Sequence, residues 1–202
     1  MPSDAGALIP ASVVLQRLHD EVTTDHFTLG WLMGKLGKRS FGIIMLLLAV
    51  VAIAPGVSMV AGLLLMIPAF QMLMGEPIPV FPRSIAARPF ATRHLAALVQ
   101  RAVPALTKLE NVIRPRFPTP HEATKRIVGS VVLALAANLA FIPVPLSNIV
   151  PALLIALISL AYLQDDGFVL SIALLVAVIV LTVELVAVWE TIRGAKWIVG
   201  LW

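Results

Sequence analysis

The sequence predicts an all-α integral membrane protein, from its composition, its long apolar blocks and the prolines inside them. Of 202 residues, 59% are hydrophobic and 13% are charged, whereas soluble domains are about 45–50% apolar and about 25% charged. The blocks 41–74, 127–164 and 168–189 each exceed the roughly 18 residues of a membrane-embedded helix, and their one charged residue is Glu184. We expect a single membrane domain over 1–202, with two proline-broken helical hairpins of a re-entrant kind as an internal repeat, one conventional C-terminal transmembrane helix, and interfacial amphipathic helices.

The N-terminal region, 1–40, is amphipathic. Apolar residues follow Ser12, a candidate N-cap, at helical spacing. A second apolar stretch, Phe27 to Leu36, is followed by the basic pair Lys38 and Arg39. Both stretches suit helices that lie in the membrane interface. The first residues lack a basic segment and a long apolar run, so no cleaved signal peptide is expected.

The first hairpin, 41–75, breaks at Pro55-Gly56. As one straight helix its apolar residues would extend about 51 Å, against a hydrocarbon core of about 30 Å. Proline removes a helical N–H, and glycine permits the turn conformations that follow. The arm Phe41–Ala54 would extend only about 21 Å, so a hairpin of short, re-entrant helices fits better than two full spans.

The connector, 76–119, is basic. Residues 75–126 hold nine Lys and Arg against three Glu, which predicts a cytoplasmic location. Within it, 95–113 has apolar residues at helical spacing and predicts an amphipathic helix on the inner leaflet. The basic residues expected to contact anionic lipid headgroups are Arg93, Arg101, Lys108, Arg114 and Arg116.

The second hairpin, 120–167, begins with Thr119-Pro120-His121-Glu122, an arrangement typical of a capping box with proline at the first helical position. Pro143 and Pro145 then force a break, and a second apolar arm ends at Gln164-Asp165-Asp166-Gly167. A conventional span, 168–189, follows, and the tail 190–202 has the Trp, Arg and Lys content of an interfacial anchor.

The two hairpins align loosely with each other. Arg39-x-x-Gly42 corresponds to Arg126-x-x-Gly129, and Pro55 with Ser58 corresponds to Pro145 with Ser147. Broken helices at matching positions of two halves are a known way to build a site near the bilayer midplane. We therefore favour an internal duplication over coincidence.

Enzyme signatures are missing from the sequence. It has no Gly-x-Ser-x-Gly, no phosphate-binding glycine loop and no His-Glu-x-x-His, so we expect neither catalytic residues nor a cofactor. The four histidines lie in connectors, and Asp165-Asp166 suits a solvated turn better than a metal site. The basic pI near 10.0 fits contact with anionic lipid and does not require nucleic acid.

Candidate site residues lie at the two helix breaks and at Glu184, the charged residue within an apolar block. A helix break frees backbone groups that hydrocarbon cannot satisfy, and nearby polar side chains either bind a polar substrate or satisfy those groups. Glu184 either faces a cavity or extends to the headgroups, since it lies near the end of its span. We expect Glu184 and the bend from Pro143 to Asn148 to share one substrate or proton site. The full candidate set is Glu184, Asn148, Ser147, Pro145, Pro143, Asn138, Pro55 and Ser58.

Short motifs distributed along the chain resemble a known family. They are Phe41-Gly42, Ala54-Pro55-Gly56-Val57-Ser58, Gln71-Met72-Leu73-Met74-Gly75, Pro82-Arg83, Leu109-Glu110-x-x-Ile113-Arg114-Pro115-Arg116, Ile142-Pro143-Val144-Pro145-Leu146-x-Asn148-x-x-Pro151-Ala152 and Asp166-Gly167. Their order and spacing resemble the ExoD exopolysaccharide-synthesis family, over about residues 12 to 190. The first bend departs from the family, which tends to be richer in proline there.

The resemblance implies a multi-pass protein of the bacterial inner membrane connected with exopolysaccharide synthesis or export, and it supplies no catalytic residues. Two hypotheses follow. One is a small transporter or lipid-handling protein with a polar site at the helix breaks. The other is a non-transporting accessory or regulatory protein of a polysaccharide synthesis complex. The partners considered are anionic inner-leaflet lipids, a second copy in a homodimer, and polysaccharide synthesis or export proteins.

Overall fold

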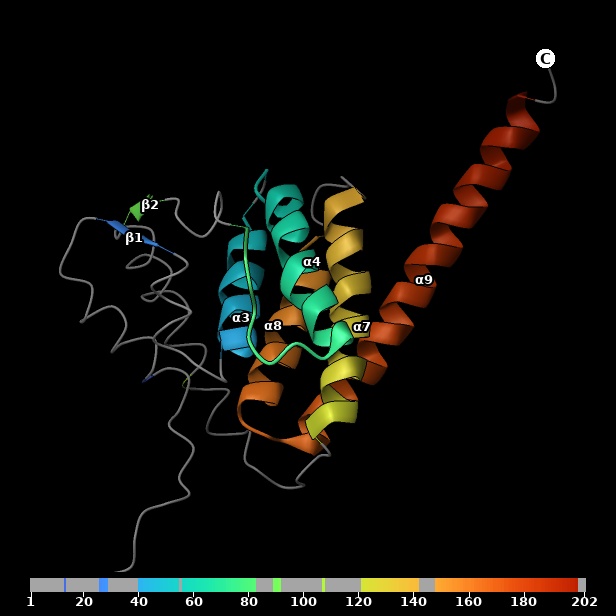
Figure 1. Ribbon diagram of the computed structural model, residues 1–202. Helices are drawn as coiled ribbons and strands as arrows, with labels where there is room; N and C mark the ends of the chain where they lie inside the picture. Colours follow the sequence, from blue (N-terminus) through green and yellow to red (C-terminus); the bar gives the residue numbers. More distant parts are fainter. Residues whose placement is uncertain are drawn as a thin grey trace, which may run out of the picture.

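Helices make up nearly all of the structure, a computed structural model that describes residues 13, 26–28, 40–54, 56–82, 89–91, 107, 121–141 and 148–199. The helices are α3 (Ser40–Ala52), α4 (Ser58–Met74), α7 (His121–Phe141), α8 (Ile149–Leu163) and α9 (Gly167–Val199), as Figure 1 shows. The predicted helical class is confirmed for this part of the chain.

Four of the helices, α3, α4, α7 and α8, form an antiparallel bundle. The most extensive contacts join α4 to α7 and α3 to α8, so each hairpin packs its first helix against the second helix of the other hairpin. Gly62, near the start of α4, lies against Ala136 and Ala140 near the end of α7. Gly42, near the start of α3, lies against Leu163, the last residue of α8. Successive bundle helices therefore alternate in direction.

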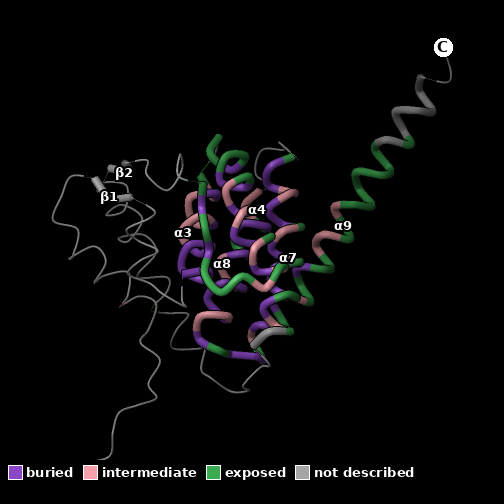
Figure 2. The backbone as a smooth tube through the Cα atoms, in the orientation of Figure 1, coloured by how far each residue is buried: buried purple, intermediate pink, exposed green. Residues whose placement is uncertain are grey.

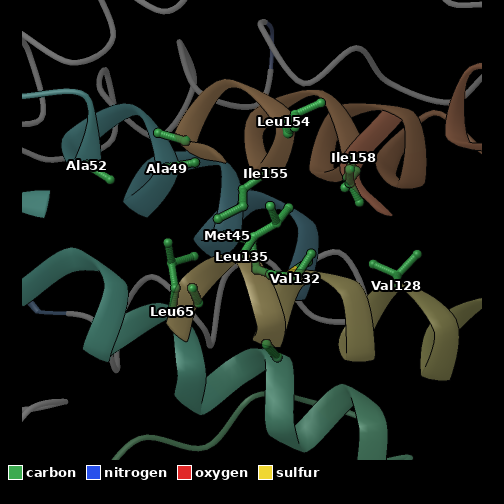
Figure 3. Close-up of a cluster of buried hydrophobic side chains, with 14 of the residues drawn as sticks. Met45, Ala49, Ala52, Leu65, Val128, Val132, Leu135, Leu154, Ile155 and Ile158 are labelled. Carbon is green, nitrogen blue, oxygen red and sulfur yellow. The ribbon is translucent and has the colours of Figure 1, made fainter. Parts of the chain in front are cut away.

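The bundle core consists of aliphatic and small side chains from all four helices. Met45 from α3, Leu65 from α4, Leu135 from α7 and Ile155 from α8 are each fully buried and extend toward one another in Figure 3. Burial of such side chains is the main stabilising contribution to packing in water. In lipid the same interdigitation acts through van der Waals contact.

The first helix break lies where the sequence predicts it. Helix α3 ends at Ala52, and α4 begins at Ser58. Between them the Ala54 carbonyl accepts a hydrogen bond from the Val57 N–H at 3.2 Å, and Gly56 has φ +81°. Glycine adopts this left-handed conformation without a steric penalty, so the turn depends on that residue.

The second break lies between α7, which ends at Phe141, and α8, which begins at Ile149. Residues 142–147 lie outside the described residues. The two breaks are at the same end of the bundle, because α3 and α7 both run toward that end. We call it the break end, and the opposite end, with Glu76, Lys125, Arg126 and Asp165, the charged end.

Residues 76–82 form an extended strap that leaves the end of α4 and runs back along the bundle (Figure 1). Gly75 ends α4 with φ +86°, and its N–H and that of Glu76 donate to the Met72 and Gln71 carbonyls, which is the Schellman pattern. The Gln71 side-chain amide then bonds both backbone groups of Val80, and Phe81 is buried. The sequence pattern does not predict this strap.

Helix α9 packs on the bundle only with its first half. Leu170, Ala173 and Ala177 are buried, whereas nearly every residue from Thr182 to Thr191 is exposed (Figure 2). The helix continues to Val199, so the predicted span 168–189 and part of the tail 190–202 form one longer helix. Ala123–Phe141 and Gly167–Thr191 are both long and apolar enough to cross a membrane.

Two short strands are additions to the expected fold. β1 (His26–Thr28) pairs antiparallel with β2 (Pro89–Ala91). The predicted helix over Phe27 to Leu36 is therefore wrong at its first two residues, where aromatic and β-branched side chains suit a strand, and 29–36 lie outside the described residues. The amphipathic helix predicted over 95–113 also lies outside them, except for Thr107, which is helical.

Candidate functional site at the helix breaks

A side-chain hydrogen bond connects the two helix breaks. The Asn148 amide Nδ2 donates to the Ser58 hydroxyl Oγ at 2.8 Å, although the two residues are 90 positions apart in the sequence. Ser58 is the first residue of α4 and is buried, and Asn148 directly precedes α8. Neither helix start has a side-chain N-cap hydrogen bond. The polar side chains at the two helix starts therefore face each other.

A second hydrogen bond connects α9 to the bundle near the same end. The Asn138 amide Nδ2 on α7 donates to the Glu184 carboxylate Oε2 on α9. Glu184 is half-buried, while its neighbours Val183 and Leu185 are exposed. The carboxylate thus turns toward α7 at the position where α9 leaves the bundle.

The helix register places the two hydrogen-bonded pairs at similar heights. A Cβ atom added to Gly62 would lie 2.8 Å from the Ala140 N and 2.9 Å from the Ala136 O, so Asn138 lies level with Gly62. Ser58 precedes Gly62 by four residues, which is about 6 Å along α4. We call Ser58, Asn138, Asn148 and Glu184 the polar set of the break end.

The polar set contains amide, hydroxyl and carboxylate groups. Amides and hydroxyls can donate and accept hydrogen bonds, and a carboxylate accepts them when ionised and can also exchange a proton. Such groups can bind a polar, uncharged portion of a substrate. The described residues contain no group of three His, Cys, Asp or Glu side chains suited to a metal ion.

The structure describes some of the predicted site residues and not others. Pro55, Pro143, Pro145 and Ser147 lie outside the described residues. The same holds for the predicted headgroup contacts, which are Arg93, Arg101, Lys108, Arg114 and Arg116. The partner found for Glu184 is Asn138, so a site shared between Glu184 and the bend from Pro143 to Asn148 stays a prediction.

Lys125 is a buried cation at the charged end that sequence reasoning missed. Its side chain is 4% exposed, and its Nζ donates to the carbonyls of Gly75 and Glu76 and lies 5.2 Å from the centroid of the Phe41 ring. A cation at these carbonyls complements the negative end of the α4 dipole. The sequence signal for this buried lysine is the Lys-Arg-x-x-Gly pattern at 125–129. It places Lys125 one helical turn before Gly129, where α7 and α4 approach closely.

Comparison with known proteins identifies the family. Residues 11–186 match the family described as "Exopolysaccharide synthesis, ExoD". The chain belongs to the ExoD family. It is 30% identical over 153 residues to Protein ExoD of Rhizobium meliloti, covering 71% of this chain and 63% of that protein.

A second relative is an uncharacterized protein of Synechocystis sp., 25% identical over 170 residues and covering 81% of this chain and 80% of the relative. No solved structure matches. The predicted resemblance to the ExoD family is therefore confirmed. The description of the family names exopolysaccharide synthesis and no reaction.

Proposed function

We propose that this ExoD protein is a multi-pass protein of the bacterial inner membrane that acts in exopolysaccharide synthesis or export as a small transporter or lipid-handling protein. The hydrogen bond between Asn148 and Ser58 carries the proposal, because it brings the two helix breaks together. Broken helices that meet within the bilayer expose polar groups to a substrate that hydrocarbon would exclude. The proposed function is non-enzymatic, in keeping with the lack of catalytic motifs in the sequence.

The apolar outer surface supports a membrane location. Exposed residues such as Val60 and Leu63 on α4, Leu153 on α8 and Ile179 on α9 form a surface suited to lipid chains. The chain would then cross the membrane with both hairpins and α9. The hairpins match each other in break position and in the close approach of Gly42 and Gly129 to the opposite hairpin, which supports an internal repeat.

The alternative is an accessory protein without transport. The Ser58 and Asn148 side chains are hydrogen-bonded to each other, as in a structural contact that stays closed. This bond favours the accessory role. The two functions differ in motion. A transporter must open the contact between the breaks to let substrate pass, whereas a scaffold can keep it closed.

A reversible cross-link separates these functions. The chain has no cysteine, so the double variant Ser58→Cys with Asn148→Cys introduces one pair at the breaks. We expect oxidation to abolish exopolysaccharide output in a producing strain that depends on this protein, and reduction to restore it. The two single-cysteine variants should be insensitive to oxidant. Full output from the oxidised, cross-linked protein would exclude transport through the breaks and favour the accessory role.

A further inference from the structure

The bundle is shorter than a bilayer is thick. Helices α3, α4 and α8 contain 13, 17 and 15 residues, or about 20, 26 and 22 Å at about 1.5 Å per residue. Helix α7 is longer, with 21 residues, but its uncharged part, 127–141, extends only about 22 Å, because Lys125 and Arg126 lie at the charged end. A typical hydrocarbon core is about 30 Å thick. A bundle that begins at one headgroup layer therefore ends several ångströms below the other.

The charges identify which end stops short. Glu76, Lys125, Arg126 and Asp165 lie at the charged end, and no residue of 40–74 or 127–164 carries a formal charge. The break end instead has the uncharged Ser58 and Asn148, which are hydrogen-bonded to each other. Polar backbone at a break is costly in hydrocarbon, so the lipids around the break end must thin or admit water.

Helix α9 reaches past the break end on one side. It starts at the charged end and extends beyond the tops of α4 and α7 (Figure 1). Near its far end the exposed Glu190 and Arg193 side chains form an ion pair at 3.2 Å, which suits the headgroup layer. One side of the molecule thus has full-length apolar surface, and the bundle beside it is short.

A polar pair lies where these two parts diverge. Asn138 on α7 and Glu184 on α9 are hydrogen-bonded to each other, and from Thr182 onward nearly all α9 residues are exposed. We call this position the fork. A lipid headgroup that enters the thinned hydrocarbon beside the fork would find an amide and a carboxylate there, which lower the cost of leaving water.

We propose that the short bundle thins the bilayer and that the fork provides a crossing point for lipid headgroups, so that this protein moves membrane lipids between leaflets. The inference rests on the lipid-handling form of the proposed function and specifies its substrate as a lipid with a polar headgroup. The bilayer adapts to a short protein by thinning at modest cost. A thinner hydrocarbon layer and polar side chains within it both reduce the barrier to crossing.

The test uses the full chain in phosphatidylcholine vesicles with 18-carbon chains and a trace of phosphatidylethanolamine labelled with a fluorophore on its headgroup. Dithionite added outside destroys only outer-leaflet fluorescence, so loss of the protected half measures crossing. We expect the protein to accelerate crossing by about tenfold or more relative to vesicles holding a single-span poly-Leu-Ala peptide, equivalent to about 1.4 kcal/mol off the barrier. Equal rates would overturn the proposal.

Variants test the fork itself. Glu184→Leu should remove most of the acceleration, while Glu184→Gln, which keeps a hydrogen-bonding side chain, should retain most of it. Thr182→Leu is the matched control, because Thr182 is an exposed polar residue of the same helix whose hydroxyl donates to the Val178 carbonyl of that helix. Size-exclusion chromatography verifies folding of each variant. An unchanged rate of lipid crossing with folded Glu184→Leu protein would exclude the fork as the crossing point.

The outcome is independent of the cross-linking experiment at the breaks. The proposed function would be upheld and lipid movement rejected if two results came together. Exopolysaccharide output would respond to the Ser58–Asn148 cross-link, and lipid crossing would be no faster than with the control peptide. Accelerated crossing, together with full exopolysaccharide output from the cross-linked protein, would support a lipid route at the fork and reject transport through the breaks.

Discussion

Two polar side chains in this protein connect segments that are distant in the sequence. Lys125 reaches the carbonyls of Gly75 and Glu76 about 50 residues away, and Asn148 reaches Ser58 from 90 residues away. A hydrogen bond involving a charged group contributes about 1.5–3 kcal/mol, and a buried group left without its partner is costly. Such residues therefore fix the register of the helices that they connect.

Lys125→Met should lower the stability of the protein by about 2 kcal/mol, since Met has similar length but cannot donate to the end of α4. The loss would appear as a lower unfolding temperature in detergent, measured by intrinsic fluorescence. Arg126→Met is the matched control, because the neighbouring Arg126 is exposed and surface charges contribute little. Equal unfolding temperatures for Lys125→Met and the unsubstituted protein would show that the buried cation does not stabilise α4.

At the scale of elements, the crossing of α4 and α7 determines where the polar set lies. A Cβ on Gly129 would lie 2.7 Å from the Leu73 N and 2.8 Å from the Ala69 O, and Gly62 meets α7 backbone in the same way. Small residues permit such close approach in membrane helices. The approach holds Asn138 at the level of Gly62 and Ser58 beside the end of α7.

Gly129→Ala and Gly62→Ala should each destabilise the protein by about 1–3 kcal/mol, because the added methyl group would displace backbone atoms. This cost opposes the gain in helix propensity of about 1 kcal/mol from replacing glycine. Gly42→Ala serves as the control, since the three atoms nearest its added Cβ all belong to the Leu163 side chain, which can change rotamer. The unfolding temperature in detergent should be higher for Gly42→Ala than for either of the other two variants. Equal unfolding temperatures would contradict backbone contact at the crossing.

The sequence predicted the elements better than their contacts. Proline chemistry located the break at 53–57 to within a few residues, and the apolar run located α8 and the start of α9. Periodicity and proline placement carry no information on which side chains meet across 90 residues, so the Ser58–Asn148 bond could not be foreseen. The partner of Glu184 was missed for the same reason, because it depends on how α9 packs on α7. The strap at 76–82 depends on Gln71 bonding Val80, which mimics backbone pairing and leaves no periodic signal.

For the whole molecule, charge asymmetry predicts orientation. Regions 1–40 and 75–126 contain four and nine Lys and Arg, whereas the end of α9 has only Arg193 and Lys196. Basic residues near membrane helices favour the cytoplasm. Because α3 and α7 both start at the charged end and α9 runs from that end beyond the break end (Figure 1), the charged end should face the cytoplasm, and the end of α9 should face the opposite side.

Single cysteines in this cysteine-free chain can test that orientation. Asp20→Cys and Gln100→Cys should react with a membrane-impermeant maleimide only when the cytoplasmic side is accessible, as in inverted vesicles. Arg193→Cys should react in intact spheroplasts, because an odd number of crossings separates it from residue 100. Labelling of residues 20 and 100 from opposite sides would contradict the first hairpin, since a hairpin returns the chain to its starting side. Labelling of Arg193→Cys from the cytoplasmic side would instead mean that α9 does not cross, and the full-length apolar surface required for a lipid route beside the fork would then be missing.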